Sequence, residues 1–140
     1  MGEYLDALEK EIDFVAAACS DRVLDSVYIG GGTPTTLEAD ELDRLLSKIR
    51  NTLDMGETKE FTVEAGRADS ITGDKLRVLQ KHGVTRISVN PQTMNEETLK
   101  RIGRQHTVQQ VVEAFRMARE EGFDNINMDV IVGLPGETPD

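Results

Sequence analysis

Segments with the composition of β-strands alternate with segments of helical spacing along the whole of this 140-residue chain. Strands are predicted where β-branched and aromatic residues gather, at Ser26–Gly31, Glu60–Ala65, Val84–Gln92 and Asn125–Glu137, the last running into a Gly-Pro turn. Parallel strands need a crossover between them, and a helix usually provides it. The alternation therefore predicts an α/β fold with parallel strands and about four βα units. Right-handed crossovers allow either an open doubly wound sheet or a barrel.

Between the strands, apolar residues recur at the spacing of amphipathic helices. The predicted helices are Glu3–Ala18, Leu37–Leu53, Ile71–Gly83, Asn95–Gly103 and Thr107–Phe123. Thr72 and Asn95 have the side chains of N-caps, and Thr107 with Gln110 has the spacing of a capping box. Glycines are placed to end the last three helices, at positions 83, 103 and 122.

Composition and charge exclude several classes of function. The formal net charge is -10, and a nucleic-acid partner would need a basic face. No apolar run approaches the roughly 20 residues of a membrane-spanning helix. The single cysteine, Cys19, allows no disulfide framework and indicates a reducing cytoplasm. We expect this thiol to be a small buried apolar group.

Ligands of parallel α/β folds bind at the carboxyl ends of the strands. The first three strands are predicted to end at Gly30–Thr33, Glu64 and Asn90–Gln92, and the fourth carries Asp129 and ends at Gly133–Gly136. Each strand end offers either bare backbone or a hydrogen-bonding side chain, a set that suits a polar small molecule with an amine, a carboxylate and a ribose. Arg104, after a helix stop, has a guanidinium that can bind a carboxylate with two hydrogen bonds.

Each of these residues also has a simpler interpretation when it is taken singly. A glycine-rich turn after a strand can bind phosphate or only turn the chain, but "GGGTPT" lacks the lysine of a phosphate loop. Pro34 also removes an N–H that phosphate would need. Glu64 alone would be a solvated residue on the polar face of its strand. Asp129, among apolar residues expected to be buried, would need a structural hydrogen-bond partner.

The loop "IGRQHT" taken alone, with Arg104 and His106, is typical of a protein surface. His82 and His106 have no further ligand at metal spacing, so no metal-binding residues are predicted.

The combined pattern is more specific than its parts. "GGGTPT", the strand ending in Glu64, "ISVNPQTMNEETLKRIGRQHT" and "NINMDVIVGLPGET" together resemble the radical S-adenosylmethionine superfamily. Within it, the chain is most similar to the oxygen-independent coproporphyrinogen III oxidase family, in its HemZ-type branch, from about Tyr4 to the last residue. The run "NPQTMN…GRQHT" is the part most specific to this branch. The resemblance implies part of a (β/α) partial TIM-type barrel.

The resemblance also implies a role for each strand-end residue. Gly31, Gly32 and Thr33 would lie against the methionyl end of S-adenosylmethionine, where glycines let the backbone approach the ligand's amine. The family's other ligand contacts match Arg104 for the ligand carboxylate, Gln92 and Asp129 for the ribose hydroxyls, and Glu64 for the ammonium or a hydroxyl.

The chain departs from the family pattern at the iron–sulfur cluster. The family holds a [4Fe–4S] cluster through three cysteines in a CxxxCxxC loop, and this sequence has only Cys19. Residues 1–140 are therefore interpreted as the middle segment of a catalytic barrel, without the first strand, its cluster loop and the C-terminal part. Alternatively, the parent protein has lost the cluster.

For the parent protein, the family implies oxidative decarboxylation in haem biosynthesis. The reduced cluster cleaves S-adenosylmethionine to methionine and a deoxyadenosyl radical, which takes a hydrogen from a propionate of coproporphyrinogen III. Loss of an electron and carbon dioxide leaves a vinyl group. The porphyrinogen and an electron donor are the implied partners, and the 140-residue chain alone is expected to be inactive.

Two other functions remain open on the sequence. One is a haem-trafficking relative within the superfamily, and the other is a non-enzymatic α/β binding module. An incomplete barrel would leave open sheet edges, so self-association of the chain is also expected.

Overall fold

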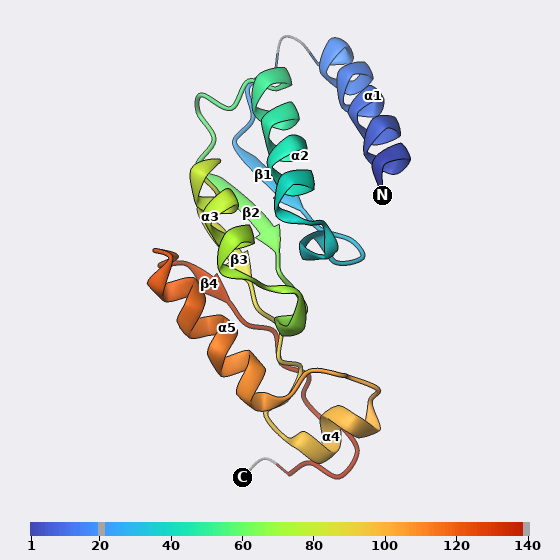
Figure 1. The fold of residues 1–140 in the computed structure, drawn as a ribbon, viewed down its shortest axis with the longest axis vertical. Coiled ribbons are helices and arrows are strands. Elements are labelled where there is room, and N and C mark those ends of the chain that lie inside the picture. The colour runs from blue at the N-terminus through green and yellow to red at the C-terminus, as the bar shows by residue number, and fades with distance from the viewer. Residues whose placement is uncertain (20–21, 139–140) are drawn as a thin grey trace.

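The structure is a computed structural model that describes residues 1–19 and 22–138, and the four strands in it form one parallel sheet in the order β1-β2-β3-β4 (Figure 1). The strands are β1 Ser26–Ile29, β2 Glu60–Glu64, β3 Arg86–Ser88 and β4 Ile126–Asn127. The helices are α1 Gly2–Ala18, α2 Ala39–Thr52, α3 Gly73–Lys81, α4 Glu96–Arg101 and α5 Val108–Glu120. The predicted α/β class and parallel strands are confirmed.

The two faces of the sheet differ in what covers them. Helices α1, α2, α3 and α5 follow one another side by side, and they pack on the face that carries Val27, Val63 and Ile87. The opposite face carries Tyr28, Glu64 and other polar side chains. A doubly wound sheet would have helices on both faces, whereas a barrel wall has them only outside. The arrangement is that of a barrel wall, and the polar face is the interior side.

Local signals at the helix ends are confirmed by hydrogen bonds. Thr72 and Asn95 accept from backbone amides of α3 and α4, and Thr107 and Gln110 form both bonds of a capping box at α5. The predicted helix-ending glycines Gly83, Gly103 and Gly122 have φ of 72°, 74° and 93°. One cap was not predicted from the sequence. Glu38 and Glu41 form a capping box at the start of α2.

The strands are shorter than the sequence predicts. β1 stops at Ile29 because the glycines that follow leave the extended conformation. β3 stops at Ser88, and Gln92 has a positive φ of 67°. β4 has only two residues, so the expectation of a strand over much of Asn125–Glu137 is wrong; beyond β4 the pairing is one isolated bridge between Gln92 and Val130. No strand of the described sheet lies outside β4 to hold this segment in a ladder.

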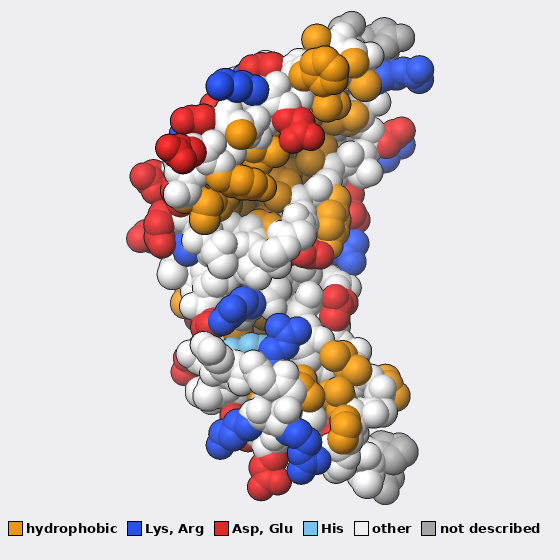
Figure 2. All heavy atoms as spheres, turned by 90° about the vertical axis from the view of Figure 1, so that its right-hand side faces the viewer, with side chains coloured by type: hydrophobic (Ala, Val, Ile, Leu, Met, Phe, Trp, Pro, Cys, Tyr) orange, Lys and Arg blue, Asp and Glu red, His pale blue; other side chains and the backbone are white. Residues whose placement is uncertain are grey.

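Helix α1 lies at the β1 side of the sheet and leaves a groove there. It packs on α2 through the buried Leu5 and through ion pairs such as Lys48 with Asp13 at 2.5 Å. Between α1, α2 and β1 lies a cavity of about 560 Å³ with a mainly apolar lining. Figure 2 shows these apolar side chains gathered in a hollow on that side of the molecule.

Among the residues described, no helix is long and apolar enough to cross a bilayer.

Cys19 is exposed at the end of α1, so the expectation that it is buried is wrong. The helix ends at Ala18, and the thiol follows it, outside the packed face.

Candidate functional site

The loop after β1 presents its backbone openly. Gly31 and Gly32 have φ of 80° and 58°, and a Cβ built on either would meet no atom within 4 Å. Both positions thus need glycine for their conformation, and both leave free space beside the backbone. Thr33 caps the following short helix η1, Pro34–Thr36, and its carbonyl accepts from the amide and the hydroxyl of Thr36.

Hydrogen bonds of Thr35, a buried residue of this loop, fix the loop to neighbouring segments. The Thr35 and Ser70 hydroxyls lie 2.6 Å apart, and Lys75 of α3 donates to the Thr35 carbonyl at 2.8 Å. Ser70 belongs to a second short helix, η2, Ala68–Ser70, which follows β2. The loops after the first two strands are therefore fastened to each other below the open glycines.

Glu64, at the end of β2, reaches the glycine loop directly. Its Oε2 accepts from the Gly31 amide at 3.3 Å, and its Oε1 accepts from the hydroxyl of Tyr28. Tyr28 was not among the predicted site residues. Its side chain stands on the polar face because alternate residues of a strand share a face, and Ser26 to Ile29 is paired in register with Glu60 to Val63.

Asp129 and Gln92 lie together at the ends of β3 and β4. The Asp129 carbonyl accepts from the Gln92 amide at 3.1 Å, and the Asp129 carboxylate accepts from the Asn127 side chain at 2.8 Å. The expectation that Asp129 sits among buried residues is wrong, because Met128, Val130 and Ile131 are all exposed. With no strand outside β4 in the described sheet, nothing covers them.

The charge of Asp129 contributes to the pKa of Tyr28, next to Glu64. The hydrogen bond to Glu64, burial and the charges of Glu64 and Asp129 raise the pKa of Tyr28 above 10.0, and Arg86 opposes them. Glu64 binds the Tyr28 hydroxyl directly, whereas Asp129 acts on it only through its charge.

Arg104 lies in the loop between α4 and α5. It lines a small hollow of about 80 Å³ together with Arg67 and His106. His106 is buried, and its Nε2 lies 3.2 Å from the Pro91 carbonyl, which fixes this loop to the end of β3. Among the residues that the structure describes, no hydrogen bond or ion pair joins the Arg104 side chain to Glu64, Gln92 or Asp129.

A second residue of the polar face was also missed. Ser88 is paired with Glu64 in the ladder, and it is only 5% exposed. Its hydroxyl has no hydrogen-bond partner among the described residues. Counting alternate residues back from each predicted strand end would have placed both Tyr28 and Ser88 on the face of Glu64.

The fold is a segment of a parallel α/β barrel with polar side chains at the ends of its strands. The sequence profile of the radical SAM superfamily matches residues 3–140. The chain belongs to the radical SAM superfamily.

Curated relatives of the chain differ in what their names state. An oxygen-independent coproporphyrinogen-III oxidase-like protein, HemZ, from Bacillus subtilis is 50% identical over 118 residues, 84% of this chain and 24% of that protein. The heme chaperone HemW from the same species is 41% identical, over 97% of this chain and 36% of HemW. The oxygen-independent coproporphyrinogen III oxidase of Escherichia coli is 33% identical, over 99% of this chain and 30% of the enzyme.

The solved structure of coproporphyrinogen III oxidase (HemN) from Escherichia coli, described as a radical SAM enzyme, matches with a TM-score of 0.88 at 33% identity. The match covers 99% of this chain and 32% of HemN. The predicted barrel-type fold and family are confirmed. The chain spans about a quarter to a third of the length of these relatives.

Proposed function

We propose that this chain forms the S-adenosylmethionine-binding part of a radical SAM enzyme related to oxygen-independent coproporphyrinogen III oxidase. The observation that carries the proposal is the contact between the Gly31 amide and Glu64 beside an open glycine loop. It combines bare backbone with a fixed carboxylate, as the amino-acid end of the ligand requires. The buried Ser88 hydroxyl, without a partner in the described part of the chain, leaves a further polar group on this face for a ligand.

Each predicted residue has a task in this proposal. Gly31, Gly32 and Thr33 bring backbone groups to the ligand amine, and Glu64 accepts a hydrogen bond from that amine or from a hydroxyl. Gln92 and Asp129 hold ribose hydroxyls. Arg104 pairs with the ligand carboxylate, for which its side chain must turn from the hollow beside His106. Bound S-adenosylmethionine supplies radical chemistry, while the residues of this chain orient the ligand and exclude water from it.

The residues present do not fit a [4Fe–4S] cluster. Such a cluster needs several thiolates, and the sequence contains only Cys19. Cys19 lines a different cavity, with Leu24 and Asp54, at the edge of the sheet where β1 begins. The glycine loop follows the other end of β1. No step through a cluster is therefore assigned to these residues.

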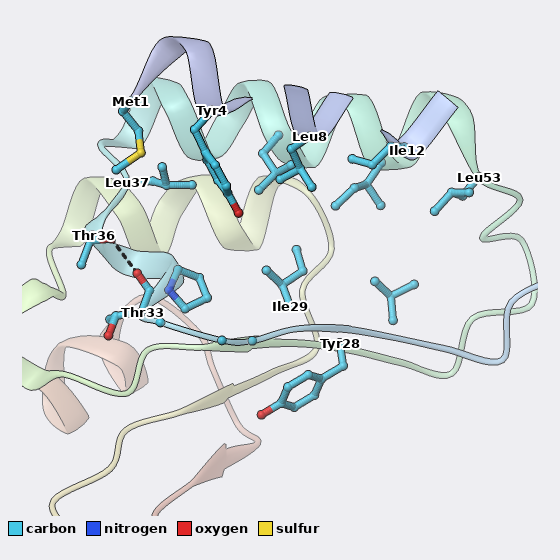
Figure 3. Close-up of a pocket in the computed structure, with 17 residues that line it drawn as sticks. Met1, Tyr4, Leu8, Ile12, Tyr28, Ile29, Thr33, Thr36, Leu37 and Leu53 are labelled. Carbon is cyan, nitrogen blue, oxygen red and sulfur yellow. Dashed lines mark hydrogen bonds between the residues drawn. The ribbon is translucent and has the colours of Figure 1, made fainter. Parts of the chain in front are cut away.

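We further propose that residues 1–140 are the middle segment of the barrel, and that the groove beside β1 receives the first strand. In Figure 3, Leu8 and Ile12 of α1 point toward β1, while Tyr28 points to the other face of the sheet. Packed helices lie about 8–10 Å apart but neighbouring strands only about 4.8 Å, so α1 extends past β1 over a further strand position. An added strand would pair with the open edge of β1 and fill the apolar groove.

The proposal extends to the reaction of the parent protein, the oxidation of coproporphyrinogen III to vinyl products in haem biosynthesis. The porphyrinogen is then the substrate, an electron donor is a partner, and the location is the cytoplasm. This reaction is supported by the relative from Escherichia coli that is named as an oxidase and by HemZ, which is named as oxidase-like. The similarity to HemW favours a second candidate, a protein that handles haem without decarboxylation. The 140-residue chain alone, whose cysteine does not fit a cluster, is proposed to be inactive in either case.

The binding part of the proposal is tested by calorimetry with S-adenosylmethionine and the 140-residue chain. We expect weak saturable binding that Glu64→Gln and Arg104→Ala each reduce about tenfold or more, because each removes a charged partner of the ligand. Lys59→Met, on the exposed Lys59 at the other end of β2, is the control and should bind as the wild type does. Equal affinity in all four proteins, or no binding, would reject the proposed site.

The reaction is tested on a longer protein of this sequence with the segments that its relatives have. Anaerobic reconstitution with iron and sulfide, followed by electron spin resonance with and without S-adenosylmethionine, should give a cluster signal that the ligand changes. Vinyl product from coproporphyrinogen III would identify an oxidase. Haem binding without that product would favour the haem-handling candidate.

A further inference from the structure

Tyr28 has an exposed ring and a hydroxyl that is held in place. It is 61% exposed, on the face of the sheet that the helices do not cover. Its hydroxyl is nevertheless bound, because it donates to Oε1 of Glu64. Tyr28 pairs with Thr62 in the ladder, so its ring leans diagonally toward the carboxyl end of β2, where Glu64 lies two residues further on.

Glu64 is therefore held by two donors from one neighbouring segment. Tyr28 binds one carboxylate oxygen and the Gly31 amide binds the other, at 3.3 Å. Two donors that bind different oxygens restrict both the position and the plane of a carboxylate. Each oxygen keeps a further lone pair free, since a carboxylate oxygen can accept two hydrogen bonds.

The first glycine of the loop is explained by the same arrangement. A Cβ on Gly30 would lie 2.5 Å from Cε1 of Tyr28 and 3.2 Å from the carboxyl carbon of Glu64. Gly31 and Gly32 differ, because free space surrounds the place of their Cβ. Gly30 thus makes room for a protein side chain, whereas the next two glycines leave room for a ligand.

We propose that Tyr28 is a positioning residue that holds the Glu64 carboxylate for the ligand, and that Gly30 is required so that the Tyr28 ring can reach it. The inference rests on the proposed function for the role of Glu64. Tyr28 would act only through Glu64.

The charges around the hydroxyl favour its donor role. The hydrogen bond to Glu64, burial, and the Glu64 and Asp129 charges raise the pKa of Tyr28, while Arg86 lowers it. The hydroxyl stays protonated at neutral pH, so it donates to Glu64 throughout that range.

The contact can be measured directly because the sequence has two tyrosines and no tryptophan. In the Tyr4→Phe variant, Tyr28 is the only tyrosine. Its ionisation is followed by tyrosinate absorbance, and circular dichroism monitors the fold. We expect a midpoint above 10.0 that falls when Glu64→Gln is added. Equal midpoints in the two folded proteins would overturn the contact.

The positioning role is measured by calorimetry with S-adenosylmethionine. Tyr28→Phe keeps the ring and removes the hydroxyl, and we expect about three- to tenfold weaker binding. Thr58→Val removes a hydroxyl that donates to the Leu24 carbonyl near the amino ends of β1 and β2, away from the site, so it is the matched control and should bind normally. Unchanged affinity in Tyr28→Phe would overturn the role.

Calorimetry on the wild type and on Tyr28→Phe distinguishes failure of the positioning role from failure of the proposed function. If the wild-type chain does not bind S-adenosylmethionine, the proposed function fails and the positioning role fails with it, whatever the titration shows. If the wild type binds and Tyr28→Phe binds equally well, only the inference fails.

Discussion

The ammonium of Lys75 lies inside the molecule, 2.8 Å from the backbone carbonyl of Thr35, 40 residues earlier in the chain. The same ammonium lies 3.4 Å from the Ser70 carbonyl, and Lys75 is only 7% exposed. This one side chain ties α3 to the loops that follow β1 and β2. The glycine loop of the proposed ligand site is thus fixed by a helix that contributes nothing else to it.

Lys75→Met should lower the free energy of unfolding by about 1–3 kcal/mol, because it leaves buried carbonyl groups without their donor. Urea unfolding followed by circular dichroism measures the change. Lys59→Met, at a side chain that is 81% exposed, should change it by less than about 0.5 kcal/mol. Equal effects of the two substitutions would show that the buried contact contributes nothing.

Alanine at Gly30 and alanine at Gly31 should each destabilise the chain, for different reasons. Gly30→Ala meets the exposed Tyr28 ring, which would move away from Glu64, and the cost should be about 0.5–1.5 kcal/mol for the lost hydrogen bond. Gly31→Ala meets no atom but has a positive φ, and should cost about 1–2 kcal/mol. In a Tyr28→Val background, the Gly30→Ala effect should fall and the Gly31→Ala effect should stay. A double-mutant cycle in urea measures the coupling, and a cycle with zero coupling between positions 28 and 30 would contradict the steric explanation.

Acid should weaken the contact between α2 and the end of α3. Asp43 accepts from Lys81 and from His82, each at 2.7 Å, and these hydrogen bonds hold its pKa below the ordinary 3.8. A lowered carboxyl pKa contributes stability that is fully present above the unfolded value and is lost as the pH falls through the folded value. The contribution of Asp43 should therefore disappear below about pH 3.8.

Asp43→Asn should be less stable than the wild type at neutral pH and should lose less of its stability on acidification. The measurement is the urea midpoint of both proteins at neutral and at acidic pH. Glu9 and Asp69 also have lowered pKa values, but both proteins keep them, so the difference between the proteins isolates Asp43. Parallel acid profiles would contradict the assignment.

The chain should self-associate, and the segment after β4 is the surface that we expect to mediate it. Val130, Ile131 and Val132 are 62%, 44% and 92% exposed beside an open sheet edge. Exposed apolar residues at an unpaired edge favour pairing between chains. Sedimentation velocity should show association that rises with concentration, and Val132→Lys should shift it toward the monomer. Phe14→Lys, at an exposed side chain of α1 that does not line the groove beside β1, is the control. A wild type that stays monomeric at every concentration would refute the prediction.

Much of the fold could be predicted because its signals are local. Thr72, Asn95 and Thr107 cap helices with their own neighbouring amides, and Gly83 ends α3 through its own φ. The strand ends were harder to predict. Gln92 leaves the extended conformation although nothing in its residue type requires it, and β4 ends after Asn127 within an apolar sequence.

The candidate site was predicted as a list of residues but not as an arrangement. The Gly31–Glu64 contact follows from the parallel register of β1 and β2, which the alternating pattern implies without fixing it. Tyr28 was missed because a tyrosine in a strand is ordinary. Its importance appears only when Glu64, 36 residues later, is placed beside it.

The sequence by itself determined the α/β class, the helix caps and the residue types at the strand ends, because periodicity and capping depend on residues a few positions apart. Tertiary structure alone decided which side chains meet. The Tyr28–Glu64 bond, the Lys75–Thr35 bond and the exposure of Asp129 depend on register, helix packing and the absence of a strand outside β4 in the described sheet. These are relations between segments distant in the chain, and local sequence carries no energy term that specifies them.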